Sequence, residues 1–367
     1  MIMSISSSRF VRMAIHPLSL IALAWLAAVL SRLTKNGDVY GLNYDLFQPD
    51  GSLYHAYTLY LQGKSWSDSA RLVNEFFQSQ IGISYLGQTI TPVVQNVIFS
   101  RPLFSILSFP FVLLLGQYGM LAIPALSYLV VGISLYLVGK KVGRPYLAAL
   151  LFFSLTLSTS VNRWMVSDLT DGLLVALISV IYILILYSRL KTPLIALISL
   201  ALLTRPSGPL LVALLLPFAF AYRRVSIYLG IAISVFGTLT LAIVSPEAAG
   251  TQTSGDYTVY QRIQDFALHA VKVFVVEFGQ LFVMDRILFV FIILSIATAL
   301  LTWRSVYSQS FLALFMACFA MGAWNGALGV NFRYQLPLVF AGGLVLIFSL
   351  SDLLARIGKL KEIPSQN

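Results

Sequence analysis

Long apolar runs separated by short polar connections dominate the chain. Ten of these runs reach or approach the length needed to cross a bilayer as a helix, about 20 residues. Because every backbone polar group in hydrocarbon must be satisfied internally, such runs form helices rather than open strands. The pattern predicts an all-α, polytopic integral membrane protein. The expected spans are 18–33, 119–139, 146–161, 172–188, 194–205, 208–222, 225–244, 286–302, 311–329 and 336–350.

Two connections, 34–118 and 245–285, are much longer than the others. The first contains two patterns of helical spacing, and in the earlier one Ser52 and His55 lie opposite the apolar side. Such helices are expected to lie at the membrane interface, where aromatic rings with one wet edge are stable. No repeat or linker divides the chain, so we expect a single domain. The two patterns consist of Leu53, Tyr54, Tyr57, Tyr60 and Leu61, and of Trp66, Ala70, Val73 and Phe77.

Composition supports the membrane interpretation. Apolar residues make up 58% of the 367 positions and charged residues 10%, whereas soluble domains carry about 25% charge. A soluble enzyme is therefore excluded. The net charge of +10 is spread between apolar segments without an arginine-rich stripe, so nucleic acid is not an expected partner. Cys318 is the only cysteine, which excludes an internal disulfide or a thiolate metal cage.

Charge also predicts orientation. With ten spans, the side bearing the N-terminus holds the basic clusters at 140–144, 189–191 and 223–224, and the positive-inside rule makes this side cytoplasmic. We expect both termini in the cytoplasm and the chain in the cytoplasmic membrane. Leu103–Leu115 is not counted as a span, because 13 residues reach only about 20 Å and Pro110 interrupts them. Twelve of the fourteen acidic residues then lie at or near the external side, which points to an external polar site.

Carboxylates are the main candidates for chemistry at that surface. The chain lacks the GxSxG, HExxH and Walker A motifs, and it has only three histidines. Asp45 and Asp50 follow the first span, and Asp50 also stands where a helix N-cap is expected. Asp168 and Asp171 lie in the short turn before the span at 172–188 and share one face if that turn is helical.

Three arginines occur at the expected external ends of apolar segments: Arg101, Arg205 and Arg333. One interpretation is that they are membrane anchors whose charged ends reach the interface. The other is that they bind phosphate, since a planar guanidinium donates two hydrogen bonds to phosphate oxygens. Acids beside arginines at one surface are the groups required to activate a hydroxyl and to hold an anionic leaving group.

Five short sequence motifs follow one another along the chain. They are Asp50 with Tyr54, Ala56 and Gly63; Arg101-Pro102-Leu103; the basic turn 139–144; Thr170-Asp171, with Asp168 as an alternative; and Arg333-Tyr334. In this order the chain resembles the GT-C superfamily of membrane glycosyltransferases, which take sugars from polyprenyl-phosphate donors. It departs from that pattern where Gly51 replaces a second acid, and in lacking a soluble C-terminal domain.

The resemblance implies an inverting transfer to a lipid or glycan acceptor hydroxyl, with Asp50 as the base. Asp45 and Asp171 or Asp168 are expected to assist it. A divalent cation, Mg²⁺ or Mn²⁺, is compatible with this site but not required, and its ligands are expected to be Asp50, Asp168 and Asp171. The expected phosphate contacts are Arg101, Arg205 and Arg333. The expected substrate contacts are Tyr54, His55 and Tyr334.

Two other functional classes stay open from the sequence. A transporter or lipid flippase suits ten helices with prolines, although such proteins tend to carry ionisable groups near the midplane. A polysaccharide polymerase or ligase is the second alternative. The long loop after the first span argues against it, because such enzymes usually carry their main external loop late in the chain.

Overall fold

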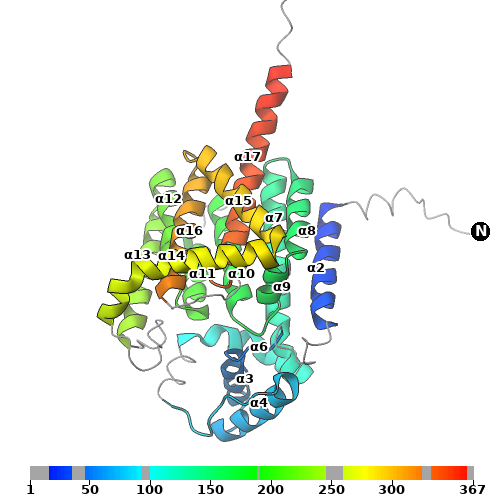
Figure 1. Ribbon diagram of the computed structural model, residues 1–367, viewed down its shortest axis with the longest axis vertical. Coiled ribbons are helices and arrows are strands. Elements are labelled where there is room, and N and C mark those ends of the chain that lie inside the picture. Colours follow the sequence, from blue (N-terminus) through cyan, green and yellow to red (C-terminus); the bar gives the residue numbers. More distant parts are fainter. Residues whose placement is uncertain are drawn as a thin grey trace, which may run out of the picture.

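The computed structural model describes residues 16–34, 46–91, 100–187, 191–244, 259–324 and 332–361. These residues form helices and connecting turns without any strand, so the predicted helical class is confirmed (Figure 1). The first half contains α2 (Pro17–Leu33), α3 (Gly51–Leu61), α4 (Trp66–Ile81), α6 (Pro102–Leu115), the 3₁₀ helix η1 (Gly116–Leu121), α7 (Ala122–Lys141), α8 (Pro145–Thr156), α9 (Thr159–Met165) and α10 (Asp171–Tyr187). The second half contains α11 (Lys191–Thr204), α12 (Gly208–Tyr222), α13 (Val225–Val244), α14 (Val259–Met284), α15 (Arg286–Leu301), α16 (Val306–Trp324) and α17 (Pro337–Lys361).

The apolar helices are compatible with a membrane protein, and each predicted span overlaps at least one of them. Within the described residues, three helical stretches are both long and apolar enough to cross a membrane: Pro102–Lys141, Phe266–Met284 and Val306–Trp324. α8 and α9 would add a fourth if counted together, although they meet at an angle of 87°. In the other apolar helices, the described apolar stretches are shorter than this, Val225–Thr240 of α13 and Pro337–Ser349 of α17 among them, so the count of ten spans stays a prediction.

Large side chains fill the centre of the helix bundle. α10 packs against α7 and α11, while α12 packs against α13 and α16. Tyr182 of α10 is fully buried; its ring lies against Phe218 and Phe340, and its hydroxyl is 2.8 Å from the Ser310 hydroxyl. Aromatic pairs and satisfied hydroxyls of this kind fix helices relative to one another. They hold α10, whose first residue is Asp171, in the middle of the bundle.

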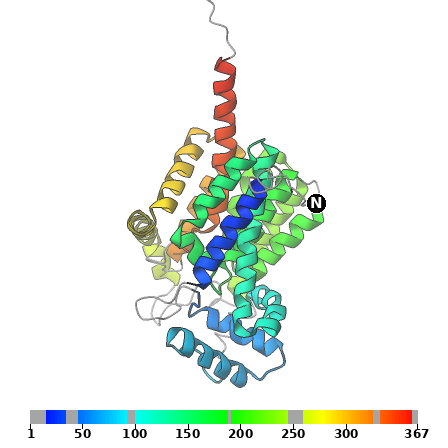
Figure 2. The ribbon, with the colours of Figure 1, turned by 90° about the vertical axis from the view of Figure 1, so that its right-hand side faces the viewer.

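α3 and α4 form a separate layer at one end of the bundle (Figure 2). α4 begins at Ser65, whose hydroxyl accepts the Asp68 N–H, and ends at Gly82 in the left-handed conformation. Its predicted apolar side is confirmed as buried, and so are Ser69 and Ile81. α6 joins this layer to the bundle, because it packs against both α3 and α11.

α3 corrects one prediction. The sequence pattern places Ser52 and His55 on a polar side facing water, yet both are buried, as is Thr58. The reason is that α3 packs against both α4 and α6, and its polar atoms find partners inside the protein. Thr58 donates to the Tyr54 carbonyl at 2.8 Å, while His55 faces Asp168 and Gln117.

Within the predicted second loop, 245–285, the structure forms α14, a helix of 26 residues. Residues 245–258 lie outside the described residues. α14 runs across the bundle and packs against α15 and α16 (Figure 1). Val271, Val275 and Val283 are exposed on its outer side, whereas Glu277 is buried.

Candidate functional site

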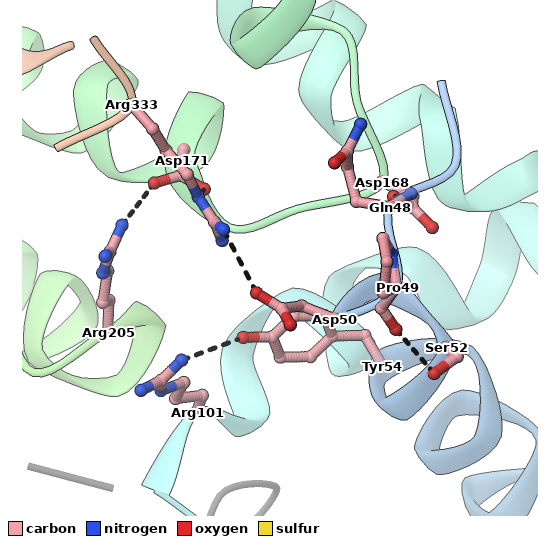
Figure 3. A network of polar contacts seen from close by, with 10 residues as sticks. All are labelled: Gln48, Pro49, Asp50, Ser52, Tyr54, Arg101, Asp168, Asp171, Arg205 and Arg333. Atoms are coloured by element: carbon pink, nitrogen blue, oxygen red, sulfur yellow. Dashed lines mark hydrogen bonds and ion pairs between the residues drawn. The ribbon is translucent and has the colours of Figure 1, made fainter. Parts of the chain in front are cut away.

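Acidic and basic side chains from distant parts of the chain meet where the α3–α4 layer joins the bundle (Figure 3). Asp171 lies at the start of α10, and only 3% of its side chain is exposed. It forms an ion pair with Arg205 from the turn after α11. Its other oxygen accepts a hydrogen bond from Arg333 Nε at 3.1 Å. The neighbouring guanidinium groups of Arg333 and Arg205 lower the pKa of Asp171 and favour its ionised form.

Arg333 joins two parts of the site. Its Nε donates to Asp171, while its Nη1 lies 3.1 Å from Oδ2 of Asp50 on the opposite side (Figure 3). Its Cζ also lies 5.4 Å from the centre of the Trp164 ring, within the range of a cation–π contact. One arginine therefore connects α10, α9 and the start of α3.

Asp50 is the exposed acid of the group, with 65% of its side chain accessible. It occupies the N-cap position of α3, but its side chain makes no capping hydrogen bond. The predicted N-cap position of Asp50 is therefore confirmed, but the side-chain capping hydrogen bond expected there is not formed. The helix starts instead on a backbone turn, in which Gly51 N–H donates to the Gln48 carbonyl at 2.8 Å. The carboxylate of Asp50 points towards Arg333 (Figure 3).

Asp168 is fully buried in the turn before α10 and faces the α3 layer rather than the arginines. Its Oδ1 accepts the Gln48 N–H at 2.8 Å, and its Oδ2 lies 3.2 Å from His55 Nε2. Burial raises the pKa of Asp168 above its ordinary value, and the contacts with His55 and Gln48 partly offset this rise. Asp168 and Asp171 are only three residues apart, yet Asp168 contacts the α3 layer whereas Asp171 contacts the arginines.

Gly51 lies in very close contact with the turn that carries Asp168. A Cβ placed on Gly51 would stand 1.9 Å from Oδ2 of Asp168. A side chain at position 51 therefore forces the Asp168 carboxylate, its turn or α3 to shift. Gly51 allows the close contact between α3 and the turn that carries Asp168.

The remaining predicted residues surround this group. Arg101 Nη1 donates to the Tyr54 hydroxyl at 3.4 Å (Figure 3). The guanidinium of Arg205 stacks over the Tyr334 ring, with Cζ 4.4 Å from its centre. His55 is buried behind Asp168. Asp45 lies outside the described residues.

Two carboxylates that the sequence analysis gave no role hold this site in place. Asp285 accepts the Ser158 hydroxyl at 2.6 Å and the Ser160 N–H at 2.8 Å, which ties the start of α9 to the start of α15. Glu277 of α14 accepts the Phe332 N–H at 2.6 Å, one residue before Arg333. Glu277 could have been singled out from the sequence, because it interrupts an apolar helical pattern, where a charged residue usually has a specific partner.

The described carboxylates do not fit the divalent cation that the sequence left open. Among the described residues, no three His, Cys, Asp or Glu side chains lie together closely enough to hold a metal ion. Asp171 is engaged by two arginines, and Asp168 by His55 and the Gln48 amide. Positive charge at this site comes from guanidinium groups, which bind the same anionic ligands as a hard cation.

An apolar groove of about 680 Å³ lies between α11 and α13. Its walls include Leu202 and Leu203, which shortly precede Arg205, and Ser100, which precedes Arg101. Phe236 and Leu203 are exposed along it. Groove and arginines together suit a molecule with an apolar chain and an anionic head.

No protein-family model, curated protein or solved structure matches this chain. The resemblance to the GT-C superfamily therefore stays a prediction.

Proposed function

We propose that this chain is a membrane glycosyltransferase that moves a sugar from a polyprenyl-phosphate donor to a hydroxyl of a lipid or glycan acceptor. One observation carries the proposal: Arg333 is shared between an exposed carboxylate, Asp50, and a buried one, Asp171. Arg101 and Arg205 add positive charge near it (Figure 3). An anion-binding group beside an accessible base is the arrangement that this transfer requires.

The donor phosphate is proposed to bind Arg333 and Arg101. Arg333 Nη1 is held by an exposed acid, so an incoming phosphate can replace Asp50 as its partner. Asp171 keeps the other side of the same guanidinium in place during this exchange. The cavity bordered by Asp171, Arg205 and Arg333 measures about 10 Å³, room for a single water, so the phosphate is assigned to the outer side.

Asp50 is proposed to accept the proton of the acceptor hydroxyl. The hydroxyl oxygen forms a bond to the anomeric carbon while the bond from that carbon to the phosphate oxygen breaks. The phosphate leaves with the electron pair, and the arginines stabilise its charge.

Asp168, Asp171 and His55 are assigned supporting roles, since all three are buried. Asp171 orients Arg333 and Arg205, whereas Asp168 and His55 fix the α3 layer that carries Asp50. Tyr54 and Tyr334 hold Arg101 and Arg205 by hydrogen bonding and stacking. The groove between α11 and α13 is proposed to take the polyprenyl chain, with the site on the external side of the cytoplasmic membrane.

The deciding experiment is sugar transfer in membranes that contain the wild type or Asp50→Asn. Undecaprenyl-phosphate-linked hexoses and pentoses serve as donors, and transfer to endogenous lipid and glycan is measured. Loss of a general base lowers the rate by about 100- to 10,000-fold, so Asp50→Asn is expected to lose kcat by this factor. Its donor KM is not expected to rise, because the phosphate no longer has to replace a carboxylate at Arg333.

Glu75→Gln is the matched control, because Glu75 is another exposed acid paired with an arginine, at 2.8 Å from Arg71. It is expected to transfer sugar at the wild-type rate. Equal rates for Asp50→Asn and the wild type contradict the proposal. Movement of intact donor across vesicles without sugar transfer contradicts it too, in favour of a flippase.

A further inference from the structure

Glu277 is a buried carboxylate in a helix whose outer side is apolar. It lies on the inner side of α14 and is fully buried, and its Oε2 accepts the Phe332 N–H at 2.6 Å. Burying a carboxylate is unfavourable unless strong hydrogen bonds satisfy it. The position of Glu277 therefore indicates that the segment it binds needs to be held.

The segment it binds has an unusual backbone. Phe332 has φ = 68°, in the left-handed region that residues with a Cβ rarely adopt. Such a conformation persists only where surrounding contacts impose it. The Phe332 side chain is fully buried, and its amide is the group that Glu277 accepts. Side-chain packing and the Glu277 hydrogen bond together impose this conformation.

The next residue is Arg333, which makes the central contacts of the site. Its carbonyl accepts the Leu336 N–H at 3.4 Å in the turn that leads into α17. The backbone of Arg333 is thus fixed on one side by α17 and on the other by the bond between Glu277 and Phe332. Its guanidinium keeps three contacts at once, with Asp171, Asp50 and Trp164.

We propose that Glu277 is a positioning residue for Arg333, acting through the Phe332 amide. It ties α14, far from the reacting groups in sequence, to the arginine that is assigned to the donor phosphate. The phosphate part of this inference rests on the proposed function; the backbone part does not. Glu277 itself touches no substrate.

The test combines hydrogen exchange with ligand binding on the purified full chain in detergent. Glu277→Leu removes the acceptor, so exchange of the Phe332 amide, followed in a peptide that starts several residues earlier, is expected to rise about tenfold or more. The amides of α7 and α10 are expected to stay protected from exchange. Glu277→Gln keeps an uncharged acceptor, so its exchange at Phe332 is expected to lie between that of the wild type and that of Glu277→Leu. Lys272→Gln, on the exposed side of the same helix, is the control and is expected to leave this exchange unchanged.

Binding of farnesyl phosphate, a short isoprenyl phosphate, is measured on the same variants by calorimetry. Glu277→Leu is expected to weaken it about tenfold, because a misplaced Arg333 loses a charge-assisted hydrogen bond. The same substitution in an Arg333→Gln background is expected to have no further effect. An undiminished effect in that background indicates general damage and overturns the proposal.

Wild-type exchange at Phe332 in Glu277→Leu also overturns the proposal. If Glu277→Leu fails to fold, Glu277→Gln decides alone, since a weaker acceptor still has to raise exchange at Phe332 by about threefold. Unchanged farnesyl phosphate affinity in Arg333→Gln contradicts the proposed function instead, and the exchange result then decides whether Glu277 holds the Arg333 backbone. The two failures are therefore distinguishable.

Discussion

Asp50 and Asp171 bind the same arginine in opposite surroundings. Both carboxylates lie 3.1 Å from a nitrogen of Arg333, yet 65% of the Asp50 side chain is exposed and only 3% of Asp171. The exposed pair is screened by water, so its net contribution to stability is small. The buried carboxylate is the counter-ion of two arginines, and its loss leaves their charge unpaired. Equal distances therefore do not mean equal roles.

This contrast separates the parts of the proposed mechanism. A group that gives up its partner when substrate binds has to be weakly held, which fits Asp50. A group that keeps an arginine oriented throughout the reaction has to be strongly held, which fits Asp171. Replacing Asp50 is therefore expected to lower activity with little loss of stability. Replacing Asp171 is expected to lower the stability of the protein.

The largest expected effect is that of Asp171→Ala. Removing one partner of a buried ion pair commonly destabilises a protein by about 3–5 kcal/mol, because the remaining charge stays buried without compensation. Asp50→Ala removes an exposed partner of the same arginine and is expected to change the free energy of unfolding by less than about 1 kcal/mol. Unfolding in detergent, followed by circular dichroism, measures both. Similar losses of stability in Asp50→Ala and Asp171→Ala would contradict the proposed difference between the two carboxylates.

Gly51→Ala tests how closely the turn before α10 approaches α3. The added Cβ would stand 1.9 Å from the buried Asp168 carboxylate, so either the helix or the turn has to move. Overpacking of this kind costs about 1–3 kcal/mol of stability. It is also expected to lower sugar transfer, since Asp50 is the neighbouring residue.

Gly279→Ala is the control for Gly51→Ala. Gly279 lies inside α14, with no atom within 4 Å of an added Cβ. Alanine in a helix is more favourable than glycine by about 0.5–1 kcal/mol, so this variant is expected to be slightly more stable than the wild type. If Gly279→Ala loses as much stability as Gly51→Ala, the effect at Gly51 does not come from the close contact with Asp168.

The helices could be predicted largely because their ends are marked locally. The predicted segment 225–244 coincides with α13, which follows two arginines, and 208–222 coincides with α12, which starts at Gly208-Pro209. The surroundings of α3 could not be predicted in this way. Its polar side is buried because α6 and Asp168 cover it, and these contacts come from residues about 50 and 115 positions away.

The site could be predicted as a set of residues but not as a set of pairs. The sequence indicated that Asp50, Asp171, Arg205 and Arg333 lie at one surface. Spacing alone could not show that Asp168 turns towards His55 while Asp171 turns towards the arginines. The supporting bond from Glu277 joins α14 to the turn before α17, and no local pattern encodes such a contact.

The smallest expected effect is the pH dependence of Asp168. Burial raises its pKa above the ordinary value of about 3.9. Between these two pKa values, Asp168 is largely ionised in the unfolded chain but still largely protonated in the folded chain. The folded state then binds more protons than the unfolded state, and its free energy of unfolding falls as pH rises from about 3.9 to the raised pKa. Beyond the raised pKa this contribution is constant.

Asp168→Asn removes this titration while keeping an oxygen that accepts the Gln48 N–H. The stability of the wild type relative to Asp168→Asn is therefore expected to be greatest at the acidic end and to decline as pH rises. Thermal unfolding midpoints of both proteins, measured in detergent from pH 4 to 7, check this expectation. A relative stability that rises with pH would mean that the contact with His55 outweighs burial. Asp168 would then be held as a carboxylate by a charged partner, as Asp171 is.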